Sequence, residues 1–199
     1  MYHSGYKKSF KITGFALVEL LVSISILVLV TGAVMANHGA FNSAVLLRGQ
    51  AYEVAFQARD TQLFAVSIMS DAGQYRNIYG LHFDKNNNTG YKIFRDSNRN
   101  SYFGTSEEFG RQGSLDSRFV IGDVRWVHSN GSETSINNVS VLFERPNFDA
   151  KFFEAAAPGG ELSNAMAVEI DIRTKGTSGN TNGEVRTVEI TRTGQISVQ

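Results

Sequence analysis

The chain has 199 residues, of which 42% are hydrophobic and 19% charged, and its 19 basic and 19 acidic residues give a formal net charge of zero. This balance excludes a strongly basic protein held to nucleic acid by bulk charge, and the apolar content excludes an acidic disordered chain. Because the sequence contains no cysteine, disulfide scaffolds, thiolate zinc sites and cysteine nucleophiles are excluded as well.

The N-terminus combines a basic leader with a long apolar segment. Residues 1–14 carry three lysines and no acidic residue, and residues 15–36 carry a single charge, Glu19. The 22 residues of the apolar segment span roughly 33 Å as a helix, which is enough to cross the hydrocarbon core of a bilayer. Because basic residues mark the cytoplasmic side of a membrane, we expect a single-pass protein with its N-terminus in the cytoplasm and residues 37–199 outside.

Two interpretations of the apolar segment are open. An ordinary secretory signal peptide would be removed by cleavage after Ala36. The apolar run is, however, longer than the about 7–15 residues that are usual in such a signal. Glu19 also lies inside the run, where a lone carboxylate costs on the order of 3 kcal/mol. A disposable segment has no reason to carry that cost, so the sequence favours a retained helix in which Glu19 has a function.

The sequence GFALVE at residues 14–19 resembles the processing site of type IV prepilins, in which a glycine precedes a hydrophobic residue and a glutamate stands fifth in the mature chain. The resemblance implies that prepilin peptidase cleaves between Gly14 and Phe15 at the inner (cytoplasmic) membrane and N-methylates Phe15. It also implies that the apolar helix stays on the mature protein. Glu19 then has a role in assembly, because its carboxylate can pair with the ammonium group of Phe15 on a neighbouring subunit.

Helical periodicity continues beyond the apolar segment, over residues 37–69. Apolar residues recur there at spacings of three, four or seven, which is typical of an amphipathic helix. They are Phe41, Val45, Tyr52, Phe56, Leu63 and Val66. We expect this stripe to pack as core against a globular domain, on one helix that is broken or bent near Gly32, Gly39 or Gly49. The alternative is a separate helix that follows a loop at residues 37–39.

From residue 70 to residue 199 the pattern changes to short strands and turns. Apolar and polar residues alternate clearly at 167–172, which predicts a half-buried antiparallel strand. Polar turn residues at 84–90 predict a hairpin, and a glycine-rich loop at 174–183 predicts a second one. The predicted strands span 78–83, 91–94, 119–128, 139–144, 165–173, 184–191 and 196–198. A long helix before an antiparallel sheet is an α+β fold, and the resemblance to pilins makes it the pilin fold.

Two later segments extend the resemblance. Residues 94–100, followed by Glu107 and Glu108, look like a loop of the FimT/GspH group of minor pilins and pseudopilins, and residues 188–194 look like that group's last strand and turn. The group implies a structural subunit of a type IV pilus or type II secretion pseudopilus that contacts other pilins or pseudopilins and carries no catalysis. The alternative outside this family is a secreted β-rich protein with an ordinary signal peptide.

The same loop has the spacing of a calcium-binding loop. Asp96, Asn98, Asn100 and Glu107 stand at positions 1, 3, 5 and 12 of a twelve-residue window, as oxygen ligands do in an EF-hand loop. Position 6, where the sharp turn normally needs glycine, is Ser101. The alternative is a solvated turn rich in Asn and Ser, with no cofactor.

Nucleic acid is the alternative partner, because one branch of the group captures DNA through a basic gly-arg-x-arg motif near the C-terminus. Residues 194–197 match that position but lack both arginines. Basic residues of the last strands alternate with acidic ones, which favours a mixed-sign, solvated face; they are Arg173, Lys175, Arg186 and Arg192. The sequence contains no nucleophile elbow, metalloprotease motif or phosphate loop, so we expect no enzymatic activity.

Overall fold

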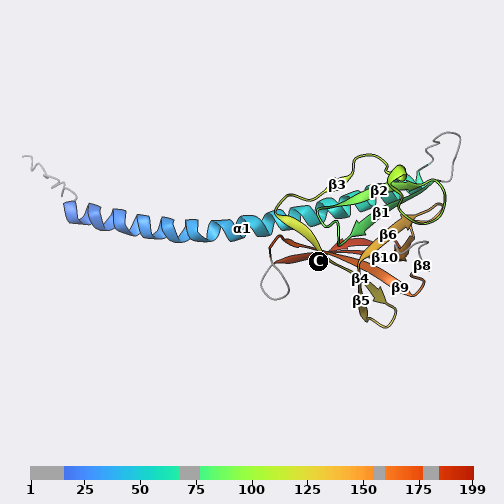
Figure 1. Cartoon of the computed structure of the whole chain (residues 1–199). Helices are drawn as coiled ribbons and strands as arrows, with labels where there is room; N and C mark the ends of the chain where they lie inside the picture. Colours follow the sequence, from blue (N-terminus) through green and yellow to red (C-terminus); the bar gives the residue numbers. More distant parts are fainter. Residues whose placement is uncertain (1–15, 68–76, 155–159, 177–183) are drawn as a thin grey trace, which may run out of the picture. The chain divides into compact units, whose positions relative to one another are not determined.

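The computed structural model describes residues 16–67, 77–154, 160–176 and 184–199, and these residues form an α+β structure (Figure 1). The chain divides into two compact units, Met1–Ser43 and Ala44–Gln199. A single long helix contributes to both units, and all of the described strands belong to the second unit.

Helix α1 spans Leu17–Val66 without interruption. Residues 37–39 are helical, so the predicted continuation beyond the apolar segment is confirmed, and the alternative of a loop at this point is wrong. The helix also continues through the glycines at positions 32, 39 and 49 without a break. In its apolar part, the hydroxyl groups of Ser23 and Ser25 donate to backbone carbonyls one turn earlier, at Glu19 and Leu21. The two serines therefore bring no unsatisfied donor into this segment.

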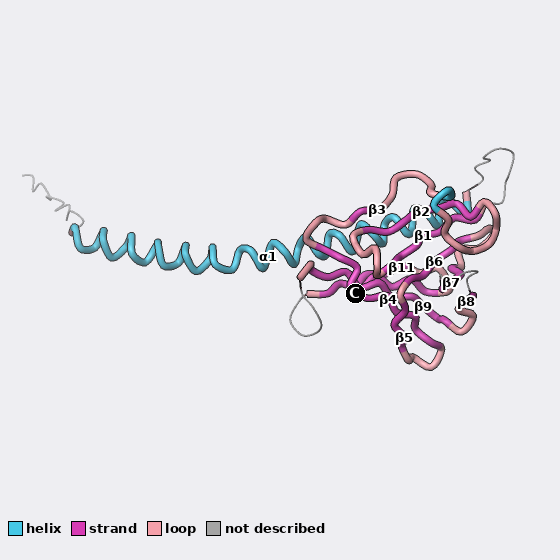
Figure 2. The backbone as a smooth tube through the Cα atoms, viewed as in Figure 1, coloured by secondary structure: helices cyan, strands magenta, loops and turns pink. Residues whose placement is uncertain are grey.

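Two antiparallel sheets follow the helix, where the sequence indicated one sheet (Figures 1 and 2). The first sheet has the strand order β3-β2-β1-β6-β7-β8; these strands span Gly113–Ser114, Gly90–Asp96, Ile78–Asp84, Asn138–Phe143, Ala150–Glu154 and Gly160–Glu161. The second sheet has the order β11-β10-β9-β4-β5; these strands span Ile196–Val198, Val185–Thr191, Ala165–Thr174, Phe119–His128 and Glu133–Ile136.

All seven predicted strands are present, and each end lies within two residues of the predicted one. The predicted hairpin at 84–90 joins β1 to β2, and the predicted loop at 174–183 joins β9 to β10, although residues 177–183 of that loop lie outside the described part of the chain. Strands β3, β5, β7 and β8 and a short 3-10 helix, η1 at Thr105–Glu107, were not predicted. These elements are five residues or shorter, so they carry little periodic signal.

One hydrophobic core joins the second half of α1 to both sheets. The first sheet contributes Phe83, Val141 and Phe152, and the second contributes Val124 and Ile170, all of them fully buried. A smaller cluster of Phe94, Leu142 and Phe153 lies on the other face of the first sheet. That face is therefore only partly covered.

The helix face that meets this core differs from the predicted one. The buried apolar residues of the helix repeat at spacings of four, three, four and seven; they are Leu47, Ala51, Val54, Ala58 and Ala65. Three of the five are alanines, whose small side chains let the helix approach the sheets closely. The predicted core stripe is wrong over most of its length, because Val45, Tyr52, Phe56 and Leu63 are between 51% and 66% exposed.

Candidate functional site

The residues of the predicted processing site lie at the edge of the described chain. Gly14 and Phe15 fall outside the described residues, so the cleavage and methylation expected there stay predictions. Glu19 lies in the first turn of α1, on the exposed part of the helix. It is the only charged residue of the segment Leu17–Met35. An acidic residue in the first turn of a helix interacts favourably with the helix dipole.

The N-terminal part of α1 is an apolar helix that no other part of the described chain covers. Leu17–Met35 is the one described helix segment that is long and apolar enough to cross a membrane, with a mean hydropathy of 2.5. None of its residues is buried within the protein, and large side chains are exposed around the whole helix. A helix that is apolar on all sides requires an apolar environment, either lipid or other protein chains.

A second apolar surface lies on the part of α1 that belongs to the globular unit. We call the exposed residues Val45, Tyr52, Phe56 and Leu63 the outward stripe. Their spacing of seven, four and seven residues places them along one line of the helix surface. Arg48 borders the stripe, where its guanidinium donates to the Tyr52 hydroxyl oxygen at 3.3 Å and lies 5.5 Å from the centre of the Tyr52 ring. The stripe combines apolar contact area with a cation beside it, which is a common composition of protein interfaces.

The sequence contained the signal for the orientation of this helix. The outward stripe and the buried apolar residues of α1 both have a helical period. The outward stripe consists of large side chains, whereas the buried set consists mainly of alanines. Periodicity alone does not decide which face is buried, because either set can form an apolar stripe. A small-residue stripe opposite a large one indicates close packing on one side and a partner on the other.

The predicted calcium loop forms a closed turn that its own side chains hold together. The carboxylate of Asp96, 3% exposed, accepts hydrogen bonds from the backbone N–H groups of Asn100 and Ser101 at 3.1 and 2.9 Å. The amide oxygens of Asn98 and Asn100 each accept from the N–H two residues later, at 2.9 and 2.8 Å. The two bonds to the Asn98 and Asn100 side chains are Asx turns, which are common in tight loops.

Glu107 closes the same loop from its other end. Its carboxylate is 6% exposed and accepts from the N–H and hydroxyl groups of Ser97 at 3.1 and 3.0 Å, and from the N–H of Gly104 at 3.2 Å. Ser101 has a φ of 62°, so the serine adopts the left-handed conformation that glycine would take at this position.

The structure therefore brings together Asp96, Asn98, Asn100 and Glu107 in one loop, as the sequence predicted, with both carboxylates occupied by protein donors. Among the described residues, no group of three or more His, Asp or Glu side chains could hold a metal ion. Hydrogen bonds within the chain account for the shape of the loop, and calcium binding at this loop stays a hypothesis.

The arginines of the last strands do not form one basic surface. Arg186 pairs with Ile172 in the register of β9 and β10, whereas Arg173 is the next residue along β9, so the two arginines face opposite sides of the sheet. Arg192 donates to the backbone carbonyls of Ala165 and Leu162 at 2.8 and 2.7 Å, which ties its guanidinium to the protein.

The outer face of the second sheet has mixed charge, as the sequence indicated. Arg125 of β4 donates to both carboxylate oxygens of Asp171 and, at 2.7 Å, to Glu169. Asp171 also accepts from the hydroxyl of Thr187 on β10 at 2.7 Å. The hydrogen bonds to Asp171, and to a smaller extent Glu169, hold the pKa of the Arg125 guanidinium above its ordinary value. Burial acts in the opposite direction, but its effect is weaker. This arrangement provides no uniformly basic surface for a polyanion.

His82 and Ser140 form the closest approach to a catalytic pair among the described residues, but they lack its geometry. His82 Nδ1 lies 3.0 Å from Ser140 Oγ, and the Ser140 side chain is fully buried. A serine nucleophile has to be accessible to substrate and is paired with Nε2 of a histidine whose Nδ1 faces a carboxylate. His128 instead contacts the Thr134 hydroxyl at 2.8 Å on the neighbouring strand. Each of the two histidines therefore contacts a hydroxyl group on a neighbouring strand.

Comparisons of the chain with protein-family models, with curated proteins and with solved structures found no match.

Proposed function

We propose that this protein is a membrane-anchored structural subunit that assembles with similar subunits through α1, as a minor pilin or pseudopilin of a type IV pilus or type II secretion system does. The exposed apolar surface of α1 carries the proposal. It includes the entire circumference of Leu17–Met35 and the outward stripe on the globular unit. A soluble monomer gains nothing from such surfaces, whereas a subunit that moves from lipid to a helical assembly needs both.

The role of Glu19 follows from the same surface. A carboxylate in lipid is tolerated when a cation compensates it, and the resemblance to prepilins supplies that cation as the N-terminal ammonium of a neighbouring subunit. Cleavage between Gly14 and Phe15 by prepilin peptidase would create this ammonium group. We therefore place the N-terminus on the cytoplasmic side of the inner membrane and the globular unit on the other side.

Assembly with proteins is favoured over DNA capture. The arginines that could have formed a basic surface face opposite sides of the sheet or bind backbone carbonyls, and Arg125 is surrounded by acidic side chains. These residues therefore form no uniformly basic patch that could bind a phosphate backbone.

N-terminal sequencing of the mature protein tests the processing step. We expect methylated Phe15 as the first residue, and a large side chain at position 14 should leave the leader uncleaved. A mature chain that begins at Asn37 would establish a secretory signal peptide instead.

Photo-crosslinking in cells tests the assembly step. A photoreactive amino acid is placed at Phe56, in the outward stripe, and as a control at Lys151, an exposed residue of β7. We expect crosslinks to other subunits from Phe56 and not from Lys151, and a loss of these crosslinks in Glu19→Val. Glu19→Val should insert into the membrane at least as well as the unmodified chain, so its effect reports on assembly. Equal crosslinking from both positions, or full crosslinking in Glu19→Val, would contradict the proposal.

A further inference from the structure

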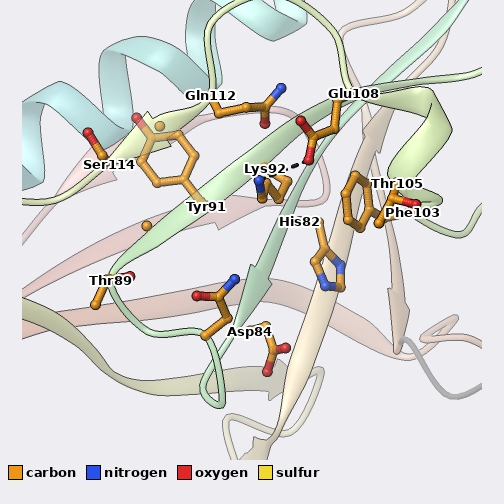
Figure 3. A pocket seen from close by; sticks show the side chains of 13 residues that line it. His82, Asp84, Thr89, Tyr91, Lys92, Phe103, Thr105, Glu108, Gln112 and Ser114 are labelled. Carbon is orange, nitrogen blue, oxygen red and sulfur yellow. Dashed lines mark hydrogen bonds and ion pairs between the residues drawn. The ribbon is translucent and has the colours of Figure 1, made fainter.

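A cavity of about 550 Å³ opens beside β1 and β2 of the first sheet, and no residue of α1 lines it (Figure 3). His82 of β1 and Lys92 of β2 are directly paired across the two strands and form its floor, while Leu81 and Ile93, the neighbouring pair, face the main core. The loop that follows β2 supplies Phe103, whose ring lies beside His82. The volume lies within the range of about 300–1,000 Å³ that is typical of small-molecule sites.

The cavity contains polar side chains that the protein itself does not use. Asn87, Thr89, Thr105 and Ser114 line it and make no side-chain hydrogen bond within the described part of the chain. They come from the hairpin between β1 and β2, from η1 and from β3, so polar residues of three separate elements line one cavity. These groups both donate and accept hydrogen bonds. They match a ligand that carries several hydroxyl groups.

An aromatic ring stands in a fixed position beside these groups. Phe103 stacks on the His82 ring at a centroid distance of 5.1 Å and an interplanar angle of 20°. It also packs edge-on against Phe94 at 5.5 Å. His82 is held in turn by its contact with Ser140. Because these contacts fix both rings, the rings offer a rigid surface at little cost in conformational entropy. The C–H face of a sugar ring is the kind of ligand surface that packs on such a ring.

The charges of the cavity exclude other ligand classes. Lys92 Nζ lies 2.9 Å from Glu108 Oε1, so these two charges compensate each other across the cavity. Asp84 adds a further carboxylate, one of whose oxygens accepts from the N–H of Asn86. The surplus of negative charge disfavours phosphate or another anion. The many polar groups disfavour an apolar ligand, since their burial would leave them without hydrogen bonds.

We propose that this cavity binds a short, uncharged saccharide, with one sugar ring on Phe103 and its hydroxyl groups bonded to the polar side chains around it. The proposal is independent of the assembly through α1, because the cavity shares no residue with that helix.

Saturation-transfer NMR on the full-length chain tests the proposal. The protein is kept in micelles of a detergent whose headgroup is not a sugar, and it is titrated with N,N′-diacetylchitobiose, cellobiose and maltose. We expect saturable binding of at least one of the three with a dissociation constant of about 1 mM, as for a small ligand in an open site. No saturation by any of them up to about 20 mM would overturn the proposal. Saturable binding of inorganic phosphate in their place would also overturn it.

Two phenylalanine variants locate the binding. Phe103→Leu keeps an apolar side chain but removes the aromatic face, and we expect affinity to fall by about tenfold or more. Phe148→Leu is the matched control, because Phe148 is also partly exposed but lies outside the cavity, and its affinity should not change. Thr105→Val removes a single hydroxyl group without changing side-chain size, so it should weaken binding even if Phe103→Leu disturbs the loop. Unchanged affinity in both cavity variants would overturn the proposal.

Discussion

Replacement of Gln62 by leucine should destabilise the globular unit, because this side chain joins three separate segments. Gln62 lies on α1 and is only 4% exposed. Its amide nitrogen Nε2 donates to the carbonyl of Phe148 at 2.7 Å and to the carbonyl of Gly194 at 2.9 Å. The helix is thereby bonded to the segment before β7 and to the turn between β10 and β11.

The magnitude follows from the two hydrogen bonds. Each contributes roughly 0.5–1.5 kcal/mol net, and a buried carbonyl that loses its donor costs roughly 1–3 kcal/mol. Gln62→Leu preserves much of the side-chain volume, so we expect a loss of about 2 kcal/mol in the free energy of unfolding. The turn cannot easily move to compensate. Gly194 has a φ of 79°, and a Cβ atom there would lie 1.9 Å from the Phe148 carbonyl oxygen.

Urea unfolding of the full chain in micelles measures this loss. Trp126 is the only tryptophan, and it packs partly buried against the core, so its fluorescence reports on the globular unit. With a denaturant slope of about 2 kcal/mol per molar urea, the unfolding midpoint should fall by about 1 M. Gln57→Leu on the same helix is the control, because the Gln57 side chain makes no hydrogen bond within the described residues. Equal midpoints for the two variants would refute the role assigned to Gln62.

Three further predictions concern the outer face of the first sheet and the loop that follows β2. Burial lowers the pKa of His82 below its ordinary value, with Asp84 opposing the shift; the unfolded chain therefore binds the proton more tightly, and the free energy of unfolding should fall as the pH drops below about 6.5. His82→Gln should reduce that dependence in urea unfolding between pH 7 and pH 5, and an unchanged slope would contradict the assignment. Asp96→Ala should lower the unfolding midpoint, because it leaves the N–H groups of Asn100 and Ser101 without acceptors. Calcium at several millimolar should leave the midpoint of the unmodified chain unchanged, and a rise that Asp96→Ala abolishes would instead establish the calcium site.

The strands could be predicted because their signal is local. In β9, the buried residues Val168, Ile170 and Ile172 alternate with the half-buried polar residues Glu169 and Asp171, as the sequence indicated. The division into two sheets has no such local signal, since it depends on β4 pairing with β9, whose partners lie 37 to 55 residues apart in the chain. Strand β7 was missed because its five residues carry too little alternation to separate a strand from a loop.

The sites could be predicted only where they lie in one stretch of sequence. Asp96 and Glu107 were found together because a loop of twelve residues contains both. The cavity beside His82 could not be found in this way, because residues from β1, from η1 and from β3 meet there only after the strands pair. The stacking of Phe103 on His82 likewise joins positions that no sequence pattern connects.

The sequence periodicity and the structure disagree on which face of α1 packs against the sheets. One pair of variants distinguishes the two faces. Ala58 is fully buried against the sheets, whereas Phe56, two residues earlier, is 66% exposed. Ala58→Leu forces three additional carbon atoms into a close-packed contact, so we expect a loss of about 1–3 kcal/mol in the free energy of unfolding. Phe56→Ala should change it by less than about 0.5 kcal/mol, because the ring contributes little to the core, while it removes apolar area from the outward stripe. The same urea titration measures both variants, and photo-crosslinking from Tyr52 measures assembly in Phe56→Ala. If Phe56→Ala were the destabilising change and Ala58→Leu were neutral, the stripe of large side chains would be the core face after all, and the proposed assembly surface would lie elsewhere.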